Sequence, residues 1–417
     1  MGTPSTDIEL RQMSANPAFL KLPTPDVLEN STPIKALYVH VPFCSTKCHY
    51  CDFYSLAGHL DKAGDYLDAL AEEIKIQTDH FGSIAPETIF IGGGTPTLLF
   101  PADLAKLLKM ITCSLNPRNL LEFTVESNPN TFDSEKARVL RDANVNRISF
   151  GAQSFIPSEL AALQRDHDPK SVPAAVRAAR DAGIQNVNID LIFAIPGQTL
   201  DTLEQSLDMA LMCRPEHLSC YSLMYEPNTP LTARLKQGLV TPVDESTELA
   251  MLKLVHEKLS SAGMFGYEIS NYARPGRECR HNLHYWNASN HLAWGPSAWA
   301  HHSGWRWKNA PSLMRWGDAL RRKPAIGPIT EREQLTGLKR WGELAILQLR
   351  LKQGIDLKAF ERRTGIQVQD QLDGVLRKYN GLGFLNIDQE HLALSDAAIA
   401  VSDTIFADVL AAFHGSH

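Results

Sequence analysis

The sequence predicts an α/β protein in which six βα units form an incomplete barrel, followed by a smaller helical, winged-helix-like C-terminal domain. Three observations support this fold class. Between residues 36 and about 225, short β-branched or aromatic runs alternate with helical periodicity, which is typical of parallel strands with helices outside. Polar or Gly-rich motifs recur where these runs end. From about residue 335, helical segments lead into two short strand-like runs.

The barrel prediction rests on six strand-like runs: residues 37–43, 88–92, 121–126, 147–150, 187–193 and 218–225. Helix candidates lie between them, including 60–82 and 102–115, and Pro101 suits the first turn of the second. Six parallel strands fit an incomplete barrel or an open doubly wound sheet. Because polar motifs follow nearly every strand, the barrel is favoured, since it gathers all strand ends at one mouth.

The remaining chain divides by composition. Residues 281–307 hold five of the fifteen histidines and five of the seven tryptophans. Helices are expected near 344–351, 356–364, 367–380 and 396–413, with a hairpin at 383–387 and 391–394. We therefore expect four parts: a flexible N-terminal extension (1–34), the barrel (35–265), a His/Trp-rich connecting segment (266–330) and the C-terminal domain (331–417).

Composition indicates a soluble cytoplasmic protein. The chain has 417 residues, 44% hydrophobic and 21% charged, which is ordinary for a globular protein. No apolar stretch approaches the ~18 residues that span a bilayer. The net charge of −6 gives no general attraction to nucleic acid, so none is expected as a partner. Seven cysteines, an odd number, argue against a disulfide framework.

Three cysteines, Cys44, Cys48 and Cys51, lie within eight residues directly after the first strand-like run. Their spacing lets one loop place three thiolates around an inorganic centre. Three thiolates are one short of a saturated [4Fe–4S] cluster, so one iron would stay open. Unrelated buried cysteines and a Cys3His zinc site using His40 or His49 are the alternatives. Cluster ligation is favoured because such zinc sites usually pair C-x2-C units.

The run Gly92–Pro96 follows the second strand and contains three glycines. It matches neither the dinucleotide fingerprint nor a P-loop. Alone it is a tight turn or a cradle that exposes backbone N–H donors to a ligand. Beside a cluster with an open iron, we interpret it as a cradle for a small polar ligand.

Together, C-x3-C-x2-C at the end of the first strand and the Gly-rich second strand end resemble the radical S-adenosylmethionine (SAM) superfamily. This resemblance implies a [4Fe–4S] cluster whose fourth iron chelates SAM. It also implies reductive cleavage of SAM to a 5′-deoxyadenosyl radical, with a flavodoxin- or ferredoxin-like electron donor.

Finer matches over roughly 36–410 resemble the branch that contains oxygen-independent coproporphyrinogen III oxidase (HemN) and the haem chaperone HemW. They include 37–44, 92–96, 125–129, 151–155 and 196–199. The resemblance implies a SAM pocket lined by Tyr38, Tyr50, Gly93, Gly94, Thr95, Glu126, Gln153, Arg165 and Asp190. Arg165 suits a carboxylate and Glu126 suits ribose hydroxyls. For Asp190 and Gln153, a role as satisfied polar residues of the barrel is the alternative.

Two features favour the chaperone side of this branch. Phe53 stands at the position where the oxidase motif has a further cysteine, two residues after the third. Residues 281–286 resemble the H-N-x-x-Y-W motif of HemW. The motif implies haem binding with His281 as axial ligand. A structural His–aromatic cluster and a zinc site from Cys279, His281 and His284 are the alternatives.

The implied function is a haem chaperone that binds a cluster, SAM and haem and delivers haem to an acceptor protein. An acceptor bound to a membrane would be contacted peripherally. Coproporphyrinogen III oxidation is the alternative activity, and a radical enzyme acting on RNA is a third, against which the acidic net charge argues. The chain also departs from the branch, with Gln164, Ala194 and Ser297 where glycine is usual.

Overall fold

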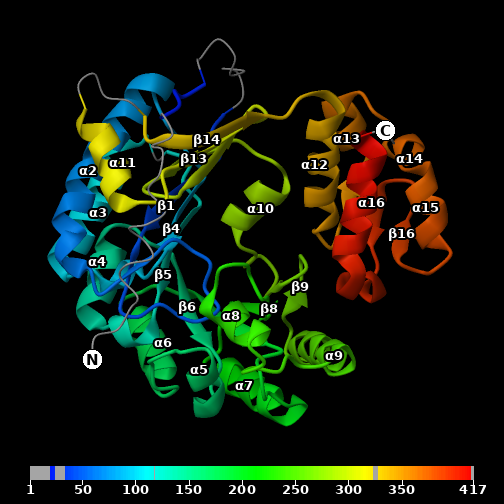
Figure 1. Cartoon of the computed structure of the whole chain (residues 1–417), viewed down its shortest axis with the longest axis horizontal. Coiled ribbons are helices and arrows are strands. Elements are labelled where there is room, and N and C mark those ends of the chain that lie inside the picture. The colour runs from blue at the N-terminus through cyan, green and yellow to red at the C-terminus, as the bar shows by residue number, and fades with distance from the viewer. Residues whose placement is uncertain (1–18, 24–32, 117, 323–326, 415–417) are drawn as a thin grey trace.

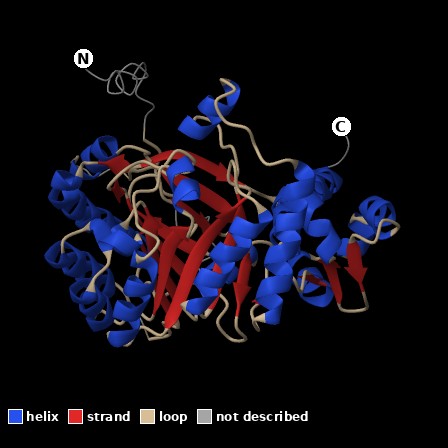
Figure 2. Ribbon diagram, turned by 90° about the horizontal axis from the view of Figure 1, so that it is seen from below, coloured by secondary structure: helices blue, strands red, loops and turns tan. Residues whose placement is uncertain are grey.

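The computed structural model describes residues 19–23, 33–116, 118–322 and 327–414. A twelve-stranded sheet in the order β14-β13-β12-β11-β1-β4-β5-β6-β7-β8-β10-β9 forms its centre. Figure 2 shows the strands as one curved sheet with helices along its outer side. The α/β class and the partial barrel predicted from the sequence are confirmed.

All six predicted parallel strands form: β1 (Ala36–Val41), β4 (Thr88–Gly93), β5 (Glu122–Ser127), β6 (Arg147–Gln153), β7 (Asn186–Phe193) and β8 (His217–Ser222). Each is buried over most of its length on both faces, which explains its nearly continuous apolar sequence. All their C-terminal ends therefore meet at one edge of the sheet, where the polar motifs lie.

The sequence analysis missed a seventh parallel strand, β11 (His291–Trp294), which pairs with the other side of β1. Beyond it, β12 (Trp299–His302), β13 (Trp305–Asn309) and β14 (Ile329–Gln334) continue the sheet in antiparallel fashion. At the opposite edge, β10 (Asn271–Ala273) and β9 (Phe265–Gly266) are also antiparallel. The segment that we predicted as a connector thus contributes strands to the main sheet, while the domain division itself stays a prediction.

The helices cover the sheet and carry local signals for their ends. Pro101 occupies the first turn of α3, Thr199 forms a capping box at α7, and Asp244 caps α9. The helices are α2 (Ala63–Phe81), α3 (Pro101–Ser114), α4 (Ser134–Asp142), α5 (Pro157–Ala162), α6 (Ser171–Asp181), α7 (Leu200–Met212), α8 (Pro230–Lys236), α9 (Glu245–Ser261), α10 (Arg280–Trp286) and α11 (Leu313–Arg321). In Figure 1, α10 lies between the sheet and the C-terminal helices.

The C-terminal unit has its own apolar cluster and a small three-stranded sheet in the order β15-β17-β16. Its elements are α12 (Gly337–Leu349), β15 (Ile355–Asp356), α13 (Leu357–Thr364), α14 (Val368–Gln371), α15 (Asp373–Asn380), β16 (Leu385–Ile387), β17 (His391–Leu394) and α16 (Ser402–His414). The predicted helices and hairpin are all present.

Among the described residues, one helical segment, Asp396–His414, is long and apolar enough to cross a membrane by length and composition alone. Its Ile405, Val409 and Phe413 side chains are buried in the C-terminal cluster. We therefore interpret it as the core helix of this unit.

Most of the predicted N-terminal extension lies outside the described residues. Within the part that is described, Leu20 forms a β-bridge with Ile329, and its N–H donates to the Ile329 carbonyl at 2.8 Å. The Phe19 ring lies 5.7 Å from the guanidinium groups of Arg315 and Arg322. Residues 19–23 therefore pack against the far edge of the sheet.

Candidate functional site

The cysteine loop leaves β1 and is held at its base by a short parallel pair, β2 (Phe43–Cys44) with β3 (Leu56–Ala57). The loop is also tied to the strand-end region, because His49 N–H donates to the Leu163 carbonyl at 3.3 Å. In turn, Leu231 N–H donates to the His49 carbonyl at 2.9 Å. These bonds fix the loop over the mouth of the barrel.

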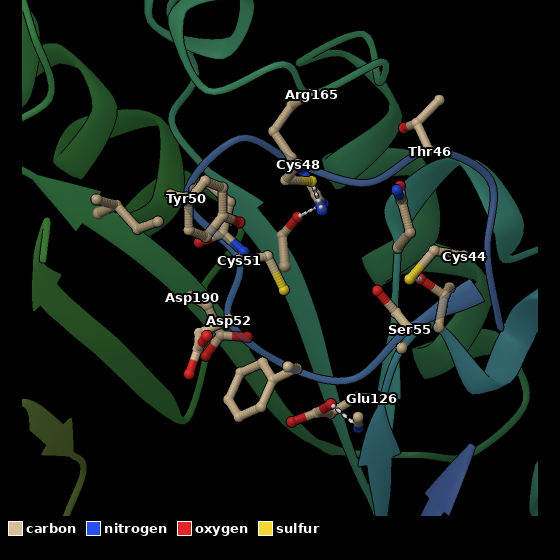
Figure 3. Close-up of a pocket in the computed structure, with 18 of the residues that line it drawn as sticks. Cys44, Thr46, Cys48, Tyr50, Cys51, Asp52, Ser55, Glu126, Arg165 and Asp190 are labelled. Atoms are coloured by element: carbon tan, nitrogen blue, oxygen red, sulfur yellow. Dashed lines mark hydrogen bonds between the residues drawn. The ribbon is translucent and has the colours of Figure 1, made fainter. Parts of the chain in front are cut away.

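All three cysteines line one cavity of about 580 Å³. Figure 3 shows the sulfurs of Cys44 and Cys51 directed toward its middle, with Cys48 beside Arg165. The Thr95 hydroxyl lies 3.9 Å from Cys44 Sγ, and Arg165 Nη1 lies 3.7 Å from Cys48 Sγ. A three-thiol set with one cationic neighbour fits an iron–sulfur cluster better than an inert core.

Burial raises the pKa of the Cys51 thiol to about 11 and also raises that of Cys44. Neutral thiols therefore predominate at pH 7 until a metal centre displaces their protons. Among the described residues, no group of three or more His, Cys, Asp or Glu side chains already converges in ligand geometry. Loading a cluster would draw the three sulfurs together and release protons.

Nine further predicted residues divide between this cavity and a second one. The cysteine cavity is lined by Tyr50, Gly93, Gly94, Thr95, Glu126, Gln153, Arg165 and Asp190. Tyr38 instead lines the second cavity, where its hydroxyl lies 3.1 Å from His40 Nδ1. Because Tyr221 and Ser222 of β8 line the first cavity as well, the ends of all six predicted strands, with the cysteine loop after β1, supply it, as the barrel prediction requires.

The three glycines are required by close packing. A Cβ on Gly93, where φ is +103°, would lie 2.4 Å from the His40 ring, and a Cβ on Gly94 would lie 2.6 Å from the Phe43 carbonyl oxygen. Our expectation of exposed N–H donors is wrong for these two residues. Gly93 N–H donates to Glu126 at 3.1 Å and Gly94 N–H donates to the Val41 carbonyl at 2.8 Å. The glycines admit neighbouring groups rather than offering donors.

Two buried carboxyl groups, those of Glu126 and Asp190, line the cysteine cavity. Burial, reinforced by the charge of Asp190, raises the pKa of Glu126 to about 7. Burial also raises the pKa of Asp190, although Ser149 Oγ and Asn188 Nδ2 donate to it at 3.0 and 2.7 Å. Two like-charged groups at this depth favour a ligand that donates hydrogen bonds to them.

Arg165 and Gln153 complete this wall. Arg165 donates through Nη2 to the Gly151 carbonyl, while its buried Nε has no hydrogen-bond partner within the described chain. Gln153 adopts a φ of +65° where the β6–β7 register shifts, so a bulge turns its side chain toward the cavity. An unpartnered buried donor and a strained residue are typical of a ligand site.

The second cavity, of about 680 Å³, adjoins the first. Phe53, with 67% of its surface exposed, lines both cavities together with Asp52, Gly93, Glu126, Ser149, Asp190 and Tyr221. Its other walls come from α10, β11, β12, β13 and α12 and carry histidine and aromatic side chains. Strands β1 and β4 add Tyr38, His40 and Phe90. As ligand-binding residues of this cavity outside the shared wall, the sequence analysis predicted only Tyr38 and His281, besides His40 and Cys279 in the alternative zinc sites.

His281 is buried on α10, which β5 anchors through Glu122. The Glu122 carboxylate accepts from the backbone N–H groups of Arg280 and His281 at 2.9 and 3.2 Å and from the Cys279 thiol at 3.4 Å. His284 Nε2 is directed elsewhere, 3.5 Å from Glu87. Cys279, His281 and His284 therefore do not converge as the alternative zinc site would require.

The curved parallel sheet with a three-cysteine loop at its mouth defines a radical SAM protein. A family model described as "Radical SAM superfamily" matches residues 38–210, and one described as "HemN C-terminal domain" matches 335–401. Coproporphyrinogen III oxidase (HemN) from Escherichia coli shares the fold, with a TM-score of 0.80 over 98% of both chains at 20% identity.

Curated relatives narrow the class. "Heme chaperone HemW" of Bacillus subtilis (strain 168) is 34% identical over 89% of this chain and 98% of the relative. The protein of the same name from Mycobacterium tuberculosis (strain ATCC 25618 / H37Rv) is 34% identical over 90% and 94%, and that of Escherichia coli (strain K12) is 36% identical over 64% and 70%. The chain belongs to the HemW family of the radical SAM superfamily.

Proposed function

We propose that this chain is a haem chaperone that binds a [4Fe–4S] cluster and SAM in the cysteine cavity and haem in the second cavity. It would deliver the haem to an acceptor protein. The observation that carries the proposal is the adjoining pair of cavities, one lined by three thiols and the other by histidines and aromatic rings. Membership of the HemW family supports the same reading.

In the first cavity, Cys44, Cys48 and Cys51 would hold the cluster. The unpartnered Nε of Arg165 would donate to the SAM carboxylate, and Glu126 and Asp190 would accept from its hydroxyl or amino groups. When bound, the cluster and SAM supply one-electron reductive chemistry fed by a flavodoxin- or ferredoxin-like donor.

In the second cavity, the aromatic rings of Tyr38, Phe90 and Tyr285 would cover an apolar macrocycle. The proposed setting is the cytoplasm, with a haem-acceptor protein as partner and peripheral contact where that acceptor is bound to a membrane. The net charge of −6 gives no reason to propose nucleic acid as a partner.

Anaerobic reconstitution of the cluster, followed by separate addition of haem and of coproporphyrinogen III with SAM and a reductant, tests this function. We expect a stable one-to-one haem complex by absorbance titration and no vinyl-bearing product from the porphyrinogen. Robust conversion of the porphyrinogen without stable haem binding would contradict the chaperone function and establish the oxidase alternative.

A further inference from the structure

Four histidines line the second cavity: His40, His281, His291 and His301. A histidine that binds a metal offers one ring nitrogen to the ion and donates with the other to a carbonyl or carboxylate. The hydrogen bonds of each ring therefore decide which histidine is free to bind iron.

Two of the four rings, those of His40 and His281, have both nitrogens engaged by protein groups. His40 has the Tyr38 hydroxyl 3.1 Å from Nδ1 and the Tyr54 carbonyl 2.8 Å from Nε2. His281 has the Thr88 hydroxyl 2.9 Å from Nδ1 and the Tyr285 hydroxyl 2.9 Å from Nε2.

His291 has the Ser289 carbonyl 3.3 Å from Nδ1, and its ring packs edge-on against the Tyr285 ring, with the two centroids 4.6 Å apart. Neither His40 nor His281 has a nitrogen left for iron without breaking an existing bond. The His281 side chain is buried, so breaking its bond to Tyr285 costs more than breaking a bond at the surface.

His301 differs from His40 and His281 in having one nitrogen without a hydrogen-bond partner among the described residues, and it differs from His291 in lying directly opposite Arg306 in the β12–β13 register. Its Nδ1 lies 3.4 Å from the Ser289 carbonyl oxygen, which holds the ring proton on Nδ1. Within the described part of the chain, its Nε2 has no hydrogen-bond partner, so a lone pair is left for a ligand. Burial lowers the pKa of His301 to about 4, and the ring is therefore neutral at physiological pH, as a metal ligand must be.

The neighbours of His301 suit the rest of a haem molecule. The β12–β13 register pairs His301 with Arg306 and Trp299 with Lys308, so these four side chains share one face of the sheet and line the cavity. Trp299 is 42% exposed, and Lys308 Nζ lies 5.3 Å from its ring centroid. Arg306 pairs with Glu333 and Glu343, and Lys308 Nζ lies 3.6 Å from Glu331.

We propose that His301, and not His281, ligates the haem iron through Nε2, with Trp299 against the macrocycle and Arg306 and Lys308 at its propionates. This inference rests on the proposed haem-binding function and names the ligand within that site. On haem binding, the propionates would replace the glutamate carboxylates that Arg306 and Lys308 contact in the structure.

The test compares haem binding to the full-length wild type and to the variants His301→Ala, His281→Ala and His301→Met. Binding of metal-free protoporphyrin IX to the same variants is the matched control, since it fills the same space without an iron to ligate. For His301→Ala we expect loss of the imidazole-type Soret spectrum and at least about tenfold weaker haem binding, because even outer-shell partners of a metal ligand contribute about 10- to 100-fold. Added imidazole should restore the spectrum, and protoporphyrin binding should not change.

His301→Met should shift the spectrum to that of a thioether ligand, which also shows that the variant folds. Loss of haem ligation in His281→Ala with a wild-type spectrum in His301→Ala would overturn the inference and leave the chaperone proposal standing. No stoichiometric haem binding by the wild type would instead overturn the proposed function, and the His301 ligand with it.

Discussion

The cysteine cavity and the histidine cavity share Gly93, Glu126 and Asp190, but their other walls come from different kinds of sequence. The first is assembled from short motifs at consecutive strand ends and one continuous loop. The second is assembled mainly from α10, the strands β11, β12 and β13, and α12, which only the folded chain brings against β1 and β4. The first is therefore set by local spacing and the second by tertiary packing.

The largest expected effect separates the two cavities. Cys48→Ala removes one of three cluster ligands, so the broad absorbance of a reconstituted [4Fe–4S] cluster should be almost entirely lost, while haem affinity should stay within about twofold of wild type. Anaerobic reconstitution with an iron assay measures the first and a haem titration the second. Cys113→Ala, at an exposed cysteine outside both cavities, is the matched control and should load normally. Full cluster loading in Cys48→Ala would refute the assignment of the ligands.

The same contrast explains what the sequence could predict. The parallel strands follow from continuous β-branched runs, and their shared direction places Glu126, Gln153 and Asp190 near the cysteines. Strand β11 has only four residues in a His/Trp-rich segment, so no periodicity marks it. Its antiparallel partner β12 places His301, ten residues later in the sequence, directly opposite His291. No local pattern contains that pairing.

The second prediction concerns the shared wall. Gly93→Ala would place a methyl group 2.4 Å from the His40 ring at a φ of +103°. Left-handed backbone and overpacking together should cost about 2–5 kcal/mol of unfolding free energy. Urea unfolding measures it. Gly276→Ala, at a φ of +77° with no neighbour within 4 Å, should cost only about 1–2 kcal/mol. An equal loss of unfolding free energy in the two variants would show that the His40 ring moves aside at little cost, so that overpacking does not contribute.

The third prediction concerns Glu126, whose folded-state pKa of about 7 exceeds the unfolded value of 4.5. Between these values the folded state binds more protons, so this group's contribution to stability falls as pH rises from about 4.5 to about 7. Glu126→Gln should therefore gain stability relative to wild type at about pH 8, on the order of 1–3 kcal/mol, and little at about pH 4. Urea unfolding at both pH values tests this. The exposed Glu135→Gln should show no such difference, and a pH-independent effect of Glu126→Gln would contradict the raised pKa.

The smallest expected effect concerns three positions at which the sequence departs from the family pattern. Gln164, Ala194 and Ser297 stand where the branch usually has glycine, and all three adopt a positive φ, of +56°, +60° and +64°. The chain thus keeps a glycine-type backbone with residues that pay a steric cost for it. Ser297 lines only the histidine cavity, so it tests that cavity alone.

Ser297→Gly should raise the unfolding free energy by about 0.5–1 kcal/mol, because relief of about 1–2 kcal/mol of left-handed strain exceeds the added entropy of the unfolded chain. Ser83→Gly, at an exposed position outside the positive-φ set, should instead lower it by about 0.4–1 kcal/mol. Urea unfolding of both variants gives the sign directly. A loss of stability in Ser297→Gly would mean that the serine hydroxyl or Cβ makes a favourable contact in the histidine cavity that outweighs the strain. Whether Ser297→Gly gains or loses stability, the cluster should load normally in this variant.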